Sequence, residues 1–293
     1  MKLVIDNVGK LYNRHFWGVS NFNLELECGV LGLLGPNGAG KSTLLRILTT
    51  IAKPTCGKVL WDDIDINKKP DEIRKVLGYL PQNFGVYPNL NAQEFLEYIA
   101  AVKGVARKQA RIRIDELLQL VNLHDVRKKP LGSYSGGMVQ RIGIAQALLN
   151  DPKILIIDEP TTGLDPEERM RMRNLFSELA GERVIIYSTH IVSDIETISS
   201  KIAIMAQGKL ITCSEPENLL RTVEGKVWEW IIPISDLEQI RKDYVISSIN
   251  RKGDNVNLRV LSSSPSCRTS KSVQPVLEDV YLYYTALSKG RNV

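Results

Sequence analysis

The sequence predicts an α/β protein in which a mostly parallel β-sheet is accompanied by an antiparallel β subdomain, a helical subdomain and a small C-terminal α+β domain. Short apolar runs alternate with longer helical patterns through the first two-thirds of the chain. Strand patterns are interrupted between Pro88 and Pro130, and the pattern changes again near the C-terminus. We therefore expect a first domain over residues 1–220, with its helical subdomain at about 88–150, and a second over 221–293.

The strands of the main sheet are predicted from uninterrupted apolar runs, which are typical of parallel strands covered on both faces. These runs are Val30–Leu34, Val76–Leu80, Ile154–Ile157, Val184–Tyr187 and Ile202–Met205. The run Val59–Trp61 gives a weaker strand signal. The segment Lys2–Leu26 alternates polar and apolar residues and predicts antiparallel hairpins beside the main sheet.

The helical insertion begins at a capping-box pattern, Asn91 followed by Glu94. Apolar residues then recur at helical spacing at Phe95, Leu96, Ile99 and Val102. A second helix is expected at about Arg107–Val121, with a buried side made of Ile112, Leu117, Leu118 and Val121.

The C-terminal part carries its own pattern of strands and helices. We expect a strand at Lys226–Ile232, a helix at Asp236–Tyr244, a loop at Ser262–Gln274 and a last helix near Val276–Leu287. Two further strands, Val245–Asn250 and Asn255–Leu261, are expected to pair around the turn Lys252-Gly253-Asp254.

The composition excludes several classes of protein. Hydrophobic residues make up 43% and charged residues 24%, which is typical of globular and not of disordered chains. No apolar run approaches the roughly 20 residues of a transmembrane helix, and we expect no signal peptide. The 4 cysteines form no C-x-x-C pair, which argues against zinc and disulfides and favours the cytosol. The net charge of +5 does not distinguish nucleic acid, an anionic membrane and solvent as surroundings.

A phosphate-binding loop is predicted from Gly35-Pro36-Asn37-Gly38-Ala39-Gly40-Lys41-Ser42, which lies between an apolar strand and the helical run Thr43–Leu48. Its glycines allow backbone N–H groups to surround a phosphate at a helix N-terminus. Lys41 supplies a charge for the β- and γ-phosphates, and Ser42 supplies a hydroxyl for Mg²⁺. This loop leaves kinases and ATPases open, whereas the guanine-reading N-K-x-D motif of GTPases is absent.

Two carboxylates end the predicted strand Ile154–Ile157. Asp158 is expected at the C-terminal edge of the sheet, where it holds Mg²⁺ through water. Glu159 is expected beside the γ-phosphate, where it acts as the general base that activates the attacking water.

A second anion-binding helix start is predicted at Tyr134-Ser135-Gly136-Gly137-Met138, before the helix Val139–Leu149. The loop Gly35–Ser42 already serves the single γ-phosphate of one chain. A second phosphate-reading surface therefore suggests a dimer, in which each copy completes the site of the other.

Over about Lys2–Leu220, the chain resembles the ATP-binding subunit of an ATP-binding cassette (ABC) transporter. In that family the corresponding LSGGQ signature contacts the γ-phosphate of the partner, here through Ser135, Gly136 and Gly137. This chain departs from the signature at Tyr134 and Met138, which are not the phosphate contacts, and it keeps the Gln140-Arg141 pair that the family has next.

The resemblance implies further roles. Gln82 resembles the Q-loop glutamine that contacts Mg²⁺, Asp165 the D-loop residue that crosses to the opposing protomer, and His190 the switch histidine at the γ-phosphate. Glu159, His190 and Gln82 are then the catalytic set, and Ser42, Gln82 and Asp158 the Mg²⁺ set. The implied nucleotide-binding set is Tyr12, which stacks on adenine, with Asn37, Gly38, Ala39, Gly40, Lys41, Ser42 and Thr43.

The resemblance also implies the partners. The stretch Gly32–Gly40, Met138 and the tail Pro275–Leu282 resemble the ABC-2 type exporter branch. We expect a cytoplasmic ATPase that uses ATP and Mg²⁺, pairs with a second nucleotide-binding subunit, and lies on the inner face of the cell membrane through a separate transmembrane permease.

Two alternatives are left open. The first is a non-transport ABC ATPase that acts on the ribosome or DNA, for which the chain lacks a second cassette and a long coiled coil. The second is a small-molecule P-loop kinase, for which Ser135-Gly136-Gly137 has no role. We expect no nucleic-acid partner.

Overall fold

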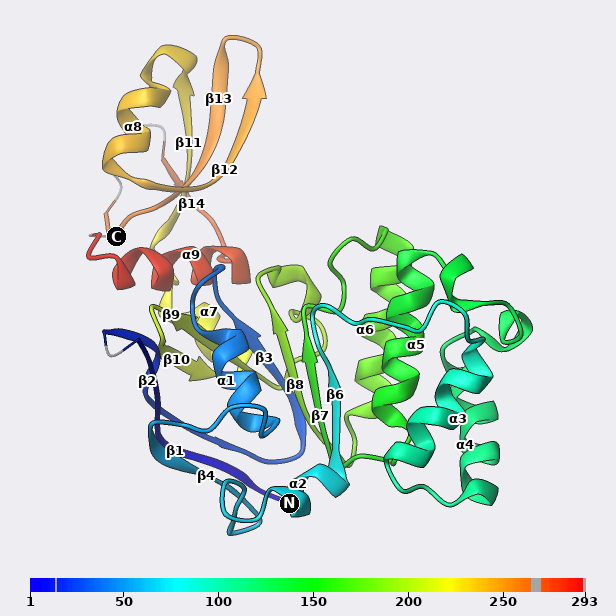
Figure 1. The fold of residues 1–293 in the computed structure, drawn as a ribbon. Helices are drawn as coiled ribbons and strands as arrows, with labels where there is room; N and C mark the ends of the chain where they lie inside the picture. The colour runs from blue at the N-terminus through cyan, green and yellow to red at the C-terminus, as the bar shows by residue number, and fades with distance from the viewer. Residues whose placement is uncertain (14, 265–269, 292–293) are drawn as a thin grey trace.

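The computed structural model describes residues 1–13, 15–264 and 270–291. Its centre is a six-stranded sheet of order β10-β9-β3-β8-β7-β6, parallel except for β10 (Figure 1). The strands are β3 (Gly29–Leu34), β6 (Leu77–Leu80), β7 (Ile154–Asp158), β8 (Val184–Thr189), β9 (Lys201–Ala206) and β10 (Lys209–Ser214). The predicted parallel strands are confirmed, and β10 is an additional edge strand whose mixed polarity concealed it.

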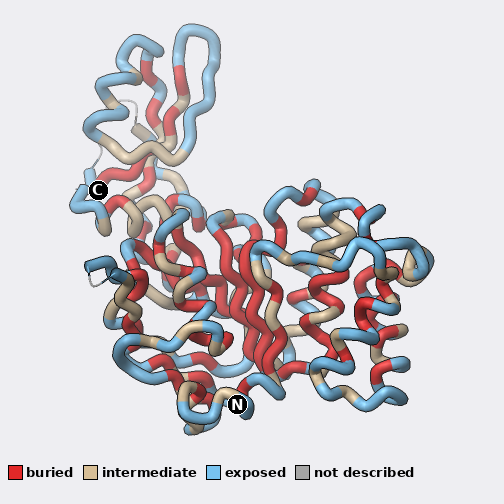
Figure 2. The backbone as a smooth tube through the Cα atoms, in the orientation of Figure 1, coloured by how far each residue is buried: buried red, intermediate tan, exposed pale blue. Residues whose placement is uncertain are grey.

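Both faces of this sheet are buried, which explains the uninterrupted apolar runs (Figure 2). In β7, Ile154 and Ile156 pack in one hydrophobic cluster, and Leu155 and Ile157 pack in the other. The first cluster contains helix α1 (Lys41–Leu48), which buries Leu44, Leu45, Ile47 and Leu48 on one side and exposes Ser42 and Arg46 on the other.

The second sheet is antiparallel, with order β2-β1-β4-β5. Its strands are β1 (Leu3–Tyr12), β2 (Phe16–Leu26), β4 (Cys56–Trp61) and β5 (Ile64–Asp65). The predicted antiparallel structure of Lys2–Leu26 is confirmed, although the segment forms one hairpin and not several. The weak strand signal at Val59–Trp61 is also confirmed. Helix α2 (Pro70–Val76) then leads into β6.

Helices cover the other face of the main sheet at one end. They are α3 (Ala92–Val102), α4 (Arg107–Leu120), α5 (Gly136–Leu148) and α6 (Pro166–Leu179). The capping box of α3 is confirmed, since the Glu94 N–H donates to Asn91 Oδ1 and the Asn91 N–H donates to Glu94 Oε2, both at 3.0 Å. Of the apolar positions of α3, Phe95 and Leu96 are buried, whereas Val102 is exposed at the helix end.

The buried face of α4 differs from the prediction at one residue. Ile112 is 59% exposed, and the buried residues are Ala110, Ile114, Leu117 and Leu118, followed by Val121 after the helix. Placing Ile112 on the buried side was wrong because it lies two residues from both Ala110 and Ile114, which puts it on the opposite side of a 3.6-residue turn.

The C-terminal sheet has the order β12-β13-β11-β14 and packs against α8 (Leu237–Asp243). Its strands are β11 (Val227–Pro233), β12 (Val245–Lys252), β13 (Asn255–Leu261) and β14 (Lys271–Ser272). The predicted hairpin is confirmed, and Gly253 supplies the positive φ of 65° in its turn. Of the predicted loop Ser262–Gln274, residues 265–269 lie outside the described residues, and Lys271–Ser272 forms a short strand beside β11 instead.

The last helix, α9 (Leu277–Ser288), returns to the main sheet (Figure 1). Its Leu277 and Val280 belong to the same hydrophobic cluster as Leu219 and Val223, at and after helix α7 (Pro216–Thr222). The domain boundary between residues 220 and 221 stays a prediction. Helix α9 belongs to the second predicted domain by sequence, but it packs on the first. Within the described residues, no helix has both the length and the apolar character needed to cross a membrane.

Candidate active site

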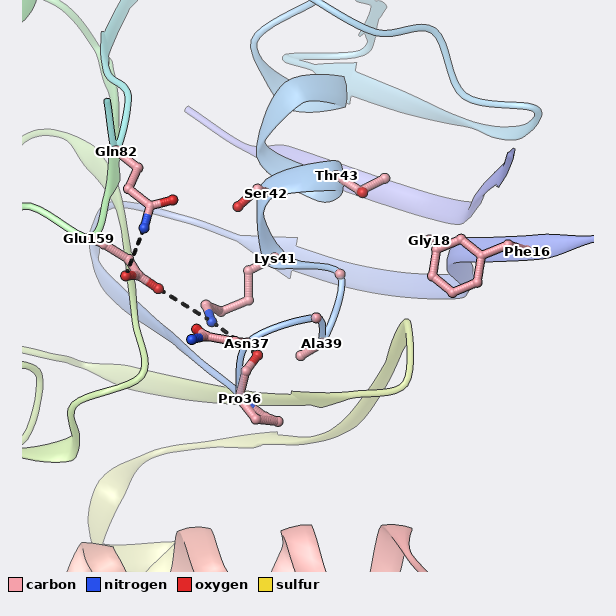
Figure 3. Close-up of a pocket in the computed structure, with 12 residues that line it drawn as sticks. Phe16, Gly18, Pro36, Asn37, Ala39, Lys41, Ser42, Thr43, Gln82 and Glu159 are labelled. Atoms are coloured by element: carbon pink, nitrogen blue, oxygen red, sulfur yellow. Dashed lines mark hydrogen bonds and ion pairs between the residues drawn. The ribbon is translucent and has the colours of Figure 1, made fainter. Parts of the chain in front are cut away.

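The predicted phosphate-binding loop forms the wall of a cavity of about 360 Å³ at the C-terminal end of β3 (Figure 3). Gly40 precedes α1 with a φ of 101°, and a Cβ on it would lie 2.3 Å from the Gly18 carbonyl oxygen. Both the conformation and the close approach require glycine. The cavity is lined by Asn37, Gly38, Ala39, Gly40, Lys41, Ser42 and Thr43, together with Gln82, Glu159, Pro36, Phe16 and Gly18.

Lys41 is buried at the centre of this cavity. Its Nζ donates hydrogen bonds to the carbonyl oxygens of Gly35, at 2.6 Å, and Pro36, at 3.3 Å, and lies 3.7 Å from Oε1 of Glu159. Burial lowers the pKa of the ammonium group, and the negative charges of Glu159 and Asp158 oppose this effect. The site therefore presents a desolvated cation, which interacts strongly with an entering phosphate.

Glu159 is buried directly after β7, in a left-handed conformation with a φ of 48°. Its N–H donates to the Ser188 carbonyl oxygen at 2.9 Å, so the end of β8 holds this unusual turn. Lys41 and His190 approach the same oxygen of its carboxylate, Oε1, with Lys41 Nζ at 3.7 Å and His190 Nδ1 at 3.2 Å.

Gln82 approaches the same carboxylate from the end of β6. Its Nε2 donates to Oε2 of Glu159 at 3.2 Å, and the Thr162 hydroxyl donates to that oxygen at 3.4 Å. Figure 3 shows Gln82 and Glu159 pointing toward Lys41. The structure thus brings Gln82, Glu159 and His190 together from three neighbouring strands, at the edge of the sheet where α/β folds bind ligands.

Asp158 occupies the last position of β7, next to the cavity. Burial raises the pKa of its carboxyl group, while the nearby hydroxyls of Ser188 and Ser42 and the charge of Lys41 lower it. Its Oδ1 is buried and has no hydrogen-bond partner among the described residues. A buried carboxylate oxygen without a partner, next to a serine hydroxyl, is the donor set that Mg²⁺ prefers, so these residues fit that ion.

The aromatic residue at the cavity differs from the predicted one. Phe16 lines the cavity and is 61% exposed, whereas Tyr12 is half-buried outside the lining. Tyr12 packs against Gly18, where its Cε2 lies 2.8 Å from the position that a Cβ would take. The two aromatics are paired across the β1–β2 hairpin, and of the two Phe16 lines the cavity.

The signature and D-loop residues lie outside this cavity wall. Ser135 is the N-cap of α5, where its hydroxyl accepts a hydrogen bond from the Met138 N–H at 3.3 Å; Gly136 and Gly137 form the first turn. Asp165 is likewise the N-cap of α6 and accepts from the Glu168 N–H at 2.9 Å. The helix of the signature therefore begins three residues earlier than Val139.

Sequence reasoning missed a buried carboxylate behind the site. Asp194 accepts hydrogen bonds from the hydroxyls of Thr161 and Thr189. Thr161 follows Glu159 closely and Thr189 precedes His190, so Asp194 joins the two segments that carry these side chains. No sequence motif marks it, because its partners come from the turn after β7 and from the end of β8.

Comparison with known proteins identifies the family. The family model described as ABC transporter matches residues 19–162. The ABC transporter ATP-binding protein YxlF of Bacillus subtilis is 38% identical over 231 residues, which are 77% of this chain and 75% of that protein. The bacitracin transport ATP-binding protein BcrA of Bacillus licheniformis is 42% identical over 196 residues, 66% of this chain and 63% of that protein.

A solved structure agrees with these matches. The ATP-binding cassette MJ0796, as a dimer in a post-hydrolysis state bound to ADP and Pi, has a TM-score of 0.67 and 28% identity, covering 73% of this chain and 98% of that chain. ADP and phosphate are the products of ATP hydrolysis. The sequence matches and the assembled cavity together show that this chain is an ATPase that belongs to the family of ABC transporter ATP-binding proteins.

Proposed function

We propose that this chain is the ATP-hydrolysing subunit of an exporter, in which closure of two nucleotide-binding subunits around ATP drives a separate transmembrane subunit. The observation that carries the proposal is Glu159, which is buried beside the phosphate-binding loop and held between Lys41, His190 and Gln82. This placement suits a general base for water that attacks the γ-phosphorus.

The chemistry proposed for the site is hydrolysis of the terminal phosphoanhydride. Glu159 accepts a proton from water as the water oxygen bonds to the γ-phosphorus, and the bond to the β-phosphate oxygen breaks to release ADP. Lys41 and the N–H groups of Gly35–Ser42 hold the phosphates, and His190 stabilises charge on the γ-phosphate. Ser42, Gln82 and Asp158 would hold Mg²⁺, which neutralises charge on the β- and γ-phosphates.

The position of the second anion-binding helix start supports a dimer. Ser135, Gly136 and Gly137 lie outside the wall of their own chain's cavity, at an N-terminus that favours anions. In the proposed assembly they contact the nucleotide of a partner subunit, and Asp165 crosses the same interface. The dimeric ATP-binding cassette MJ0796 supports this arrangement.

A membrane partner is proposed for the surface beside Gln82. Tyr87 and Tyr98 are 54% and 49% exposed and contact one another edge to face, with ring centroids 5.8 Å apart, over Phe95. Exposed aromatic clusters are typical of protein interfaces. A partner here is in direct reach of the segment that carries Gln82, and it would place the protein on the cytoplasmic face of the membrane.

The proposed partner is tested by affinity purification of tagged Glu159→Gln protein, with ATP, from solubilised native membranes. We expect a polytopic membrane protein in the eluate, and we expect its loss when Tyr87→Ala and Tyr98→Ala are combined. Ile231→Ala, an exposed apolar residue on β11, is the control. Ribosomal or nucleic-acid partners without a membrane protein would contradict the transporter and favour the non-transport class.

Replacing Phe16 by Ala is expected to weaken ATP binding by about 1–3 kcal/mol, the range for loss of base stacking on an aromatic ring. The physical reason is that Phe16 is the aromatic side chain that lines the cavity. The measurement is the Kd for Mg·ATP by calorimetry, with inorganic tripolyphosphate as a ligand that has no base and should be unaffected. Tyr12→Ala is the comparison variant, and a larger loss for Tyr12→Ala would restore Tyr12 as the stacking residue.

A further inference from the structure

A largely buried ion pair joins the signature helix to the helix after the D-loop. Arg141 lies in the second turn of α5, and its Nη2 is 3.3 Å from Oε1 of Glu168 in the first turn of α6. Their side chains are 14% and 19% exposed. The neighbouring pair on α6, Glu167 with Arg171, is 69% and 52% exposed. The Arg141–Glu168 pair is therefore much better shielded from water than the Glu167–Arg171 pair, and losing it is expected to have the larger effect.

Arg141 also anchors a third helix. Its Nη1 donates hydrogen bonds to the carbonyl oxygens of Val121, at 3.3 Å, and Asn122, at 3.2 Å. These residues follow α4, whose C-terminal end carries a partial negative charge that favours a cation. The guanidinium group thus holds α5 against both α4 and α6.

Glu168 contacts both segments that the proposed dimer uses. Its N–H donates to Oδ1 of Asp165, the D-loop residue. A Cβ on Gly137 of the signature would lie 3.7 Å from the Glu168 carboxyl carbon and 3.4 Å from Cδ2 of Leu164. Glu168 is therefore hydrogen-bonded to the D-loop residue and lies next to the backbone of the signature.

The Arg141–Glu168 pair lacks the full set of hydrogen bonds that a buried ion pair needs to stabilise the fold. Arg141 Nε and Glu168 Oε2 are buried and have no hydrogen-bond partner among the described residues. Ion pairs that are desolvated but not fully hydrogen-bonded seldom stabilise a fold more than apolar packing would. Their geometry, by contrast, specifies one arrangement of the charged groups and of the helices that carry them.

We propose that Arg141 and Glu168 are positioning residues that hold the signature segment and the D-loop in one arrangement, so that both meet the partner's nucleotide together. This inference rests on the proposed closure of two subunits around ATP. It assigns the pair to dimer formation and leaves nucleotide binding by the single subunit to the phosphate-binding loop.

The test compares Glu168→Ala with Glu167→Ala, each in the Glu159→Gln protein. Both changes remove an acidic residue from the first turn of α6, and both lose the same favourable charge at the helix N-terminus. Only Glu168→Ala removes the contact with Arg141. The measurements are the dimer dissociation constant with Mg·ATP by analytical ultracentrifugation, the Kd of the monomer for Mg·ATP, and Tm without nucleotide.

We expect Glu168→Ala to raise the dimer dissociation constant about tenfold, which corresponds to about 1.4 kcal/mol, with the Kd of the monomer for Mg·ATP unchanged. Glu167→Ala should behave as the parent, and Glu168→Gln, which keeps an oxygen for Arg141, should recover most of the loss. Equal dimerisation of Glu168→Ala and Glu167→Ala would overturn the inference alone. So would a matching loss of Mg·ATP binding by the monomer in Glu168→Ala. Because Glu168→Ala leaves Arg141 buried without its partner, its Tm is expected to fall, and a Glu168→Gln protein that regains Tm but not dimerisation would also overturn the inference. A Glu159→Gln parent that binds Mg·ATP and stays monomeric would overturn the proposed closure as well.

Discussion

Replacing Glu159 by Gln is expected to lower kcat for ATP hydrolysis by about 10²–10⁴-fold, the usual contribution of a positioned general base. The amide keeps the size of the side chain but cannot accept the proton of the attacking water. Binding of Mg·ATP should survive, because Lys41 and the N–H groups of Gly35–Ser42 hold the phosphates. The measurement is phosphate release at saturating ATP, together with the Kd for Mg·ATP.

The control for this change is Glu196→Gln, which makes the same substitution at an exposed residue near the end of β8. It should leave kcat unaltered. A Glu159→Gln protein that hydrolyses ATP at the rate of the unmodified protein would show that another group activates water. The burial of Glu159 beside Lys41 and His190 would then reflect a role in the stability of the fold and not in catalysis.

Replacing Lys41 by Ala should strongly weaken ATP binding. Removing one partner of a buried, hydrogen-bonded charge pair costs about 2–5 kcal/mol, so we expect the Kd for Mg·ATP to rise about 30-fold or more. The change removes the desolvated cation of the cavity. The negative charge of Glu159 is then no longer neutralised by that cation, so it repels an incoming phosphate. The measurement is calorimetric titration with Mg·ATP.

Lys41 also bonds to the carbonyl oxygens of Gly35 and Pro36, so its loss can affect the fold. The Tm without nucleotide reports that effect separately from the rise of Tm with ATP. Lys58→Ala, at an exposed lysine paired with Asp6, is the matched control and should keep the full rise with ATP. A Lys41→Ala protein whose Tm still rises normally with ATP would contradict the assignment.

The residues that the sequence located best are those whose role depends on local backbone. The phosphate-binding loop follows β3 and precedes α1, and its glycines are required by conformation and close approach at that point in the chain. The carboxylates Asp158 and Glu159 are similarly placed by the end of a buried strand. Both features could be predicted because strand, turn and helix are adjacent in sequence.

The site residues that were harder to predict from the sequence depend on contacts between distant segments. The β1–β2 pairing changes register between Lys10 and Leu11, and a shift of one residue reverses which side chains face a neighbour. The choice between Tyr12 and Phe16 therefore could not be read from alternation. Asp194 and the pair Arg141–Glu168 are similar, since their partners lie on loops or helices that only the folded chain brings together.

The return of α9 to the hydrophobic cluster that contains Leu155 and Ile157 changes how the small C-terminal sheet is connected. The chain leaves α7, builds that sheet, and comes back to cover α7 with Leu277 and Val280. Asp279 of α9 is fully buried and accepts hydrogen bonds from Arg259 of β13, which fastens the return. In topological terms the small sheet is an insertion held at both ends. The surface of α7 can therefore be covered only after the chain has been synthesised through Val280, some sixty residues beyond α7 itself.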